Sequence, residues 1–138
     1  KKKYPDSVEI NIKKTEFLSI INIDGNKFFI SSNGKLNKYK KIDEFLPFVF
    51  GKVDIKKFLE FKKKIDESNF DFNIVESLYY FPSNRWDIKT KKNFVIKLPE
   101  KNLKNTLEMS YKIVTDPKFV NNKMIDLRVP NRLIVIND

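Results

Sequence analysis

The segment Phe17–Ser31, FLSIINIDGNKFFIS, carries the signals that decide the fold. Phe17 to Ile23 is nearly continuous in apolar residues, as expected for a strand that is covered on both faces. Asp24-Gly25 follows, a dipeptide typical of a two-residue hairpin turn, and Lys27 to Ser31 supplies the next strand. The turn signal recurs at Asn33-Gly34. The first third of the chain is therefore predicted to be an antiparallel meander.

The regions on either side of this segment are less uniform. Val8, Ile10 and Ile12 alternate with polar residues, which predicts a strand with one face in water. Residues 35 to 52 contain Pro47 and lack a clear period, so we expect a connection with at most a short helical turn. Its three phenylalanines are expected to pack under a loop, with a binding patch as the alternative; they are Phe45, Phe48 and Phe50.

Two segments have the apolar period of a one-sided surface helix. Asp54 can cap the first, and Lys62 to Lys64 lie near its end, where the helix dipole favours cations. The second begins after Pro99 and is stopped by Pro117. Core packing is a sufficient explanation for both apolar stripes, which are Ile55, Phe58, Leu59 and Ile65 in the first and Leu103, Leu107, Tyr111 and Val114 in the second.

The remaining segments favour strands. Phe70 to Phe81 and Arg85 to Leu98 are rich in β-formers, with a hairpin across Lys89 to Asn93. Met124 to Val129 and Arg132 to Ile136 flank a turn at Pro130-Asn131. The order is thus strands, helix, strands, helix, strands. The economical architecture is an α+β fold, a mainly antiparallel curved β-sheet with two amphipathic helices packed on it.

Composition excludes most catalytic chemistry. The chain of 138 residues is 41% hydrophobic, enough for one packed core, and it has no histidine and no cysteine. Imidazole-based acid/base catalysis, thiol nucleophiles and the usual zinc ligands are therefore missing. The carboxylate pairs Asp66/Glu67 and Asp87/Glu100 are accompanied by no glycine-rich phosphate loop or nucleophile motif. We expect no catalytic residue, metal or cofactor, and hence no enzyme.

The charge balance suggests a second class of function. The formal net charge is +10, and only three of the 28 basic residues are arginines. Lysines can bind nucleic acid or an anionic membrane surface, and this is the alternative reading. However, the lysines are spread along the chain, without the compact stripe and interleaved aromatics of an RNA-binding module. No stretch is long and apolar enough to span a membrane.

The three arginines and the single tryptophan are candidate contact residues. Arg85 precedes Trp86, and Arg128 and Arg132 flank the last turn. Because a guanidinium can bind a carboxylate through two parallel bonds, this placement indicates an acidic partner at that end of the sheet. Trp86 is expected to fill the core, with an interface anchor as the alternative.

Three motifs resemble the FtsQ/DivIB cell-division family. MIDLRVPNRLIV at 124–135 is similar to the family's closing D-L-R-x-P-x-R-L-x-V hairpin. RWDI at 85–88, followed by VIKLPE at 95–100, is similar to its R-W-D-L strand and K-L-P-E helix start. YPDSVEI at 4–10 looks like the last strand of its POTRA domain. One departure is Lys92-Asn93 where the family often has Asn-Gly, and asparagine tolerates the left-handed conformation that the turn needs.

The resemblance implies residues 1–15 as the end of a POTRA domain and 16–138 as the family's C-terminal β domain. It implies a single-pass inner-membrane protein with this domain in the periplasm and with its span outside this sequence. The implied activity is a non-catalytic divisome scaffold that binds FtsB and FtsL and, by extension, FtsW/FtsI-type proteins. No nucleic acid is implied.

The resemblance also implies where the partner binds. Family members are understood to receive a strand of FtsB on the edge of the last strand, which is β-augmentation. The matching positions of this chain are Arg85, Arg128, Val129, Asn131, Leu133, Val135 and Asn137. Strand residues alternate between faces, so Leu133 and Val135 either contact the partner or face the helices together with Leu127. The sequence leaves both arrangements open.

Overall fold

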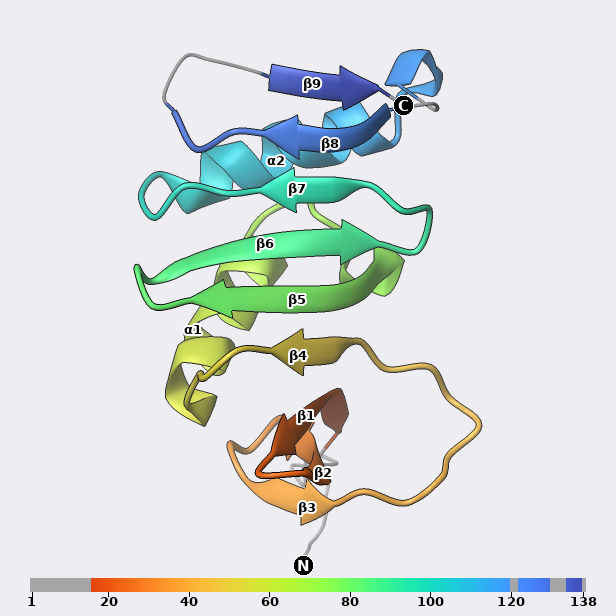
Figure 1. Ribbon diagram of the computed structural model, residues 1–138, viewed down its shortest axis with the longest axis vertical. Coiled ribbons are helices and arrows are strands. Elements are labelled where there is room, and N and C mark those ends of the chain that lie inside the picture. The colour runs from red at the N-terminus through yellow and green to blue at the C-terminus, as the bar shows by residue number, and fades with distance from the viewer. Residues whose placement is uncertain (1–15, 120–121, 130–133, 138) are drawn as a thin grey trace, which may run out of the picture.

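A single nine-stranded sheet organises the described part of the chain, with its strands in the order β3-β2-β1-β4-β5-β6-β7-β8-β9 (Figure 1). The computed structural model describes residues 16–119, 122–129 and 134–137. The strands are β1 Phe17–Ile23, β2 Asn26–Ser31, β3 Leu36–Lys38, β4 Phe48–Phe50, β5 Val75–Phe81, β6 Arg85–Thr90, β7 Val95–Lys97, β8 Asn122–Asp126 and β9 Ile134–Asn137. The helices are α1 Ile55–Glu67 and α2 Leu103–Val114, with short 3₁₀ turns η2 Phe72–Ile74 and η3 Pro117–Phe119.

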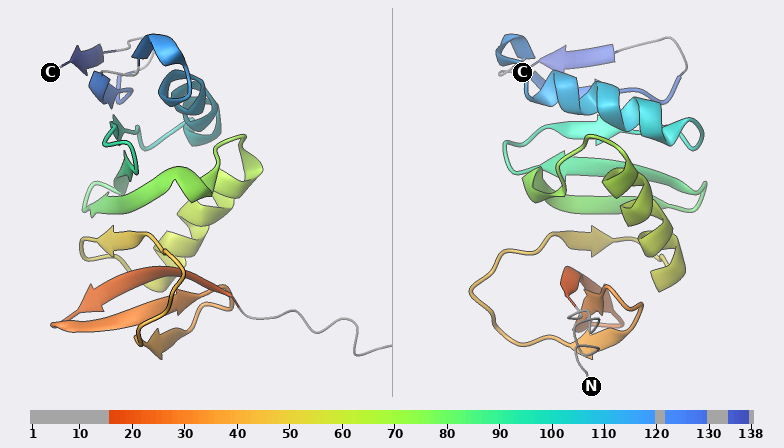
Figure 2. Two further views of the ribbon diagram at one scale, coloured as in Figure 1. Left: turned by 90° about the vertical axis from the view of Figure 1, so that its right-hand side faces the viewer. Right: turned by 180° about the vertical axis from the view of Figure 1, so that it is seen from behind.

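Both long helices cover the same face of this sheet, as the side view and the view from behind in Figure 2 show. The α+β fold with a mainly antiparallel sheet is thus confirmed. Three strand pairs are parallel, namely β1–β4, β4–β5 and β7–β8. The connecting segments explain why two of these pairs are parallel, since α1 joins β4 to β5 and α2 joins β7 to β8. A helical crossover returns the chain to the same end of the sheet, so the strand that follows runs parallel.

The predicted hairpin turns form where the sequence places them. Asp24 and Gly25 have positive φ values of 53° and 86° between β1 and β2, as a type I′ turn requires. Gly34, with φ of 84°, lies in the turn before β3. Asn93 has φ of 70° in the turn after β6, so asparagine does adopt the left-handed conformation there.

One row of aliphatic side chains crosses the sheet on its helix-covered side. Direct cross-strand neighbours share a face, and the register of successive pairs aligns one buried residue from each of six strands. Each member is 2% exposed or less. They are Ile21, Val49, Leu78, Ile88, Ile96 and Ile125. This central row extends the core over most of the sheet.

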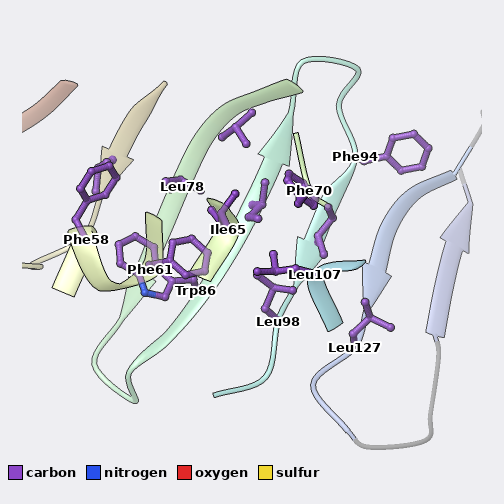
Figure 3. Packing of buried hydrophobic residues seen from close by; sticks show 14 of the residues in the cluster. Phe58, Phe61, Ile65, Phe70, Leu78, Trp86, Phe94, Leu98, Leu107 and Leu127 are labelled. Carbon is purple, nitrogen blue, oxygen red and sulfur yellow. The ribbon is translucent and has the colours of Figure 1, made fainter. Parts of the chain in front are cut away.

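The helices complete the core from above the central row (Figure 3). The Asp54 carboxylate accepts a hydrogen bond of 2.8 Å from the Lys57 amide and thereby caps α1 as predicted. From α1, Phe61 stacks on Trp86 with ring centroids 4.5 Å apart and planes within 1°. Trp86 is 6% exposed, which confirms its core role.

The interpretation of residues 35 to 52 as a connection was wrong, because this stretch contains β3 and β4. Each strand has three residues, too few to display an alternating pattern. Val49 is 2% exposed because β4 lies between β1 and β5. Phe50 points away from the core, 46% exposed, and stacks on Tyr79 with centroids 5.0 Å apart.

The closing segment differs in its bounds from the expectation. β8 begins at Asn122 and ends at Asp126, so Leu127 to Val129 lie beyond the strand rather than within it. The predicted strand at residues 8–12 and the turn at Pro130-Asn131 lie outside the described residues. The same holds for the POTRA segment 1–15, so the division at residue 16 stays a prediction.

Candidate partner-binding edge

Strand β9 forms one edge of the sheet, at the top of Figure 1. It pairs antiparallel with β8, and Val135 is opposite Ile125, whose side chain is fully buried. The neighbouring pair is Met124 and Ile136, and Ile136 is 43% exposed. An edge strand presents unpaired backbone groups that a further strand can bind.

The hydrogen-bond pattern identifies which backbone groups of β9 are free. The Leu127 amide donates to the Lys97 carbonyl at 2.9 Å, so the backbone of Leu127 and of Ile125 faces β7. The backbone groups of Asp126 therefore face β9 and bond with Ile134. It follows that the N–H and C=O of Val135, one residue further, point away from the sheet.

A charged clamp stands where β8 ends. Arg128 binds the Asp126 carboxylate through two bonds, Nε to Oδ1 at 2.9 Å and a terminal nitrogen to Oδ2 at 2.6 Å. The Arg128 amide also donates to Oδ1, at 3.0 Å. Fork-to-fork pairs of this kind hold their geometry well. The pair of Asp126 and Arg128 therefore fixes the path of the backbone directly after the end of β8, beside β9.

The contact between Asp126 and Arg128 shifts the pKa of both side chains. The side-chain hydrogen bond from Arg128 lowers the pKa of Asp126, partial burial opposes this shift, and the nearby Lys97 adds a smaller lowering. The Asp126 carboxylate in turn raises the pKa of Arg128, chiefly through the same hydrogen bond. Both groups are thus held charged at neutral pH.

Arg85 lies on β6, three strands from β9, at about 14 Å by the usual strand spacing. One terminal nitrogen donates to Asp87 at 2.6 Å and to the Leu98 carbonyl at 3.3 Å, and the guanidinium lies over Phe81, 4.6 Å from its centroid. A partner at β9 would reach Arg85 only by extending across the uncovered face of the sheet. The role of Arg85 in binding stays a prediction.

The other predicted contacts divide into two groups. Val129 is 51% exposed, directly after the clamp, while Val135 and Asn137 belong to β9. Asn131 and Leu133 lie outside the described residues. The sequence reasoning missed Asp126 as the partner of Arg128, although both arginine–aspartate pairs share a visible signal, a spacing of two residues, which places both side chains on one face of an extended chain.

The possible metal ligands among the described residues do not cluster. No group of three or more possible metal ligands occurs within them. Of the four carboxylates named in the sequence analysis, Asp66 pairs with Lys62 at 2.7 Å and Asp87 pairs with Arg85 at 2.6 Å. A cleft of about 860 Å³ lies between the loop before β4, the end of α1 and η2. No residue of β8 or β9 lines it. No described helix is long and apolar enough to cross a membrane.

Comparisons with known proteins agree on one family. The model of the cell division protein FtsQ/DivIB C-terminal domain matches residues 19–128. Among solved structures, the chain is similar to the major extracytoplasmic domain of the trans isomer of the cell division protein DivIB from Geobacillus stearothermophilus. That match has a TM-score of 0.53 at 12% identity and covers 75% of this chain and 96% of the other. A comparison with curated protein sequences finds no significant match.

The family match extends over most of the sheet, from β1 to the arginine of the clamp, and the solved DivIB domain has the same fold. Family membership implies a scaffold role in cell division with protein partners of the divisome. The chain belongs to the FtsQ/DivIB family of cell division proteins, which are non-enzymatic and membrane-anchored with this domain outside the cytoplasm.

Proposed function

We propose that this domain holds the FtsB–FtsL pair in the periplasm by adding a strand of FtsB to the free edge of β9. The observation that carries the proposal is the outward-facing N–H and C=O of Val135 at the edge of the sheet. Main-chain bonds would supply affinity, and alternate side chains of the partner would supply specificity. The anchor is proposed to be a single inner-membrane span upstream of residue 1, with a POTRA domain ending near residue 15.

The surroundings of the edge suit a protein partner. Ile136 and Val129 expose apolar side chains at the edge, 43% and 51% accessible, and a docked strand would remove part of that surface from water. The Arg128 guanidinium, bound to Asp126 but with 43% of its side chain exposed, can also approach an acidic residue of the partner. Apolar contacts and a cation would thus accompany the main-chain bonds at this edge.

The test is the affinity of a labelled peptide from the FtsB periplasmic region for three versions of the chain, measured by fluorescence anisotropy. Val135→Pro removes the outward donor but no bond between β8 and β9, so we expect affinity to fall at least about tenfold. Val135→Ala, the matched control, keeps the donor and should bind far better than the proline variant. An unchanged affinity of Val135→Pro for the peptide would contradict the edge-strand mechanism.

The same titration separates the proposal from lysine-driven binding to nucleic acid or anionic membranes. Binding through released counterions weakens steeply as salt concentration rises. Strand addition predicts a shallow salt dependence and no tight binding of the free chain to heparin. A steep salt slope that survives in Val135→Pro would favour the charge-driven alternative.

A further inference from the structure

The opposite edge of the sheet, strand β3, has a different chemistry from β9 (Figure 1). Residues 25–42 around it contain five lysines and no acidic residue. All three residues of β3 are exposed. The edge is therefore basic as well as open.

The backbone of β3 offers free bonding groups. The Ser31 amide donates to the Lys35 carbonyl at 2.9 Å, and the Tyr39 amide donates to the Lys27 carbonyl at 3.2 Å. Residues 35, 37 and 39 therefore face β2, as their register requires. The N–H and C=O groups of Leu36 and Lys38 must then point away from the sheet.

The side chains of the edge combine apolar surface with positive charge. Leu36 lies opposite the fully buried Ile30 and is 38% exposed, so a further strand would extend the core at this point. Tyr39, at the end of β3, is 37% exposed and lies under the Lys27 ammonium, 5.3 Å from the ring centroid. Lys35, Lys38, Lys40 and Lys41 are exposed, and within the described residues none forms an ion pair with a carboxylate.

Lysines on an edge strand normally deter pairing with another strand. The deterrence depends on the charge of the arriving strand. A second copy of this chain would bring lysines against lysines, which is repulsive, whereas an acidic strand would be attracted. Charge complementarity thus selects one kind of occupant.

We propose that β3 is a second strand-docking edge, which takes an acidic extended segment of another protein. The site lies at the end of the sheet opposite β9 and does not depend on the FtsB proposal. The domain then carries two edges of different selectivity, and two partners can be bound at once. Docking would use the outward groups of Leu36 and Lys38, with carboxylates of the partner beside the surrounding lysines.

The test uses a fluorescein-labelled decapeptide of alternating glutamate and valine, with fluorescence anisotropy measured on the full chain. A second peptide of the same sequence and charge is N-methylated at every backbone nitrogen, so that it has no main-chain N–H to donate. We expect the first peptide to bind at least about tenfold more tightly than the second, because the second lacks the main-chain donors. Equal binding would mean that charge alone is responsible, and no binding of the first would also overturn the proposal.

Variants of the chain locate the site. Leu36→Pro removes an outward donor while sparing the β2–β3 bonds, and we expect about a tenfold loss of affinity. The double variant Lys35→Glu/Lys38→Glu leaves the backbone unchanged and should lose at least as much, whereas Lys104→Glu on the exposed side of α2 should bind normally. Normal binding by both edge variants contradicts the proposal.

Two further measurements exclude the other occupants. Val135→Pro should leave the acidic peptide bound, because the amide of Val135 lies on β9 and not on β3. If this variant lost affinity for the acidic peptide, the binding site would be on β9. Sedimentation should show the free chain as a monomer. A dimer that Leu36→Pro abolishes would make a second copy the occupant and would overturn the acidic-partner assignment.

Discussion

Two of the three arginines bind a carboxylate that lies two residues away along the chain. Arg85 and Asp87 lie two residues apart on β6, and Asp126 and Arg128 lie two residues apart at the end of β8. A lysine could neutralise either carboxylate but could not form the two parallel bonds of the Arg128 clamp. At position 128, therefore, an arginine holds the carboxylate in an orientation that a lysine could not impose.

The clamp should make stability depend on pH. Because Arg128 lowers the pKa of Asp126, the native state binds a proton less readily than the unfolded chain, and the stabilisation is present above the unfolded pKa of about 3.9. It is lost as the pH falls through the lower folded value. Asp126→Asn should therefore be less stable than the wild type at pH 7, and the gap should close below about pH 4.

Urea unfolding at pH 7, 5, 3 and 2 measures this gap directly. Glu108→Gln, on the half-buried side of α2 and in no ion pair among the described residues, serves as the control and should give a smaller gap at pH 7 and 5. A gap for Asp126→Asn that stays constant down to pH 2 would mean that the carboxylate charge contributes nothing to the clamp.

At the scale of elements, what the sequence predicts depends on the length of the element. Both helices were predicted because each is long enough to repeat its period and has an end signal, Asp54 before α1 and Pro117 after α2. The strands β3 and β4 were not predicted, because a strand of three residues is too short to show the alternation of apolar and polar residues. Their strand character comes from tertiary pairing with β2 and with β1 and β5.

The cap of α1 gives a prediction at this scale. Asp54→Ala leaves the Lys57 amide without its side-chain acceptor, and we expect a loss of about 1 kcal/mol in the free energy of unfolding. Asn102 is the control because it caps α2 without a side-chain bond to a helix amide and has φ of 58°. Asn102→Gly, which suits that φ, should therefore cost little in urea unfolding at pH 7. Equal losses for both variants would contradict the capping role of Asp54.

At the scale of the whole molecule, the order of strands and helices could be predicted, but not the order of strands within the sheet. The hairpin signals at Asp24-Gly25 and Lys92-Asn93 specify neighbours in sequence. By contrast, the position of β4 between β1 and β5 is set by crossovers that no local signal encodes. The edge position of the last strand was expected from the family resemblance and is confirmed, yet its outward residue follows only from the register with β8.

This register gives the account its central claim, that a partner strand bonds to the outward backbone of β9. Amide hydrogen exchange followed by NMR, with and without the FtsB peptide, tests it at single residues. We predict that the Val135 amide, which faces away from β8, exchanges much more slowly in the complex. The Ile136 amide, already directed at β8, should change less, and the Leu36 amide on the opposite edge should not change. Protection that appears at Leu36, or binding that leaves Val135 unprotected, would contradict the claim.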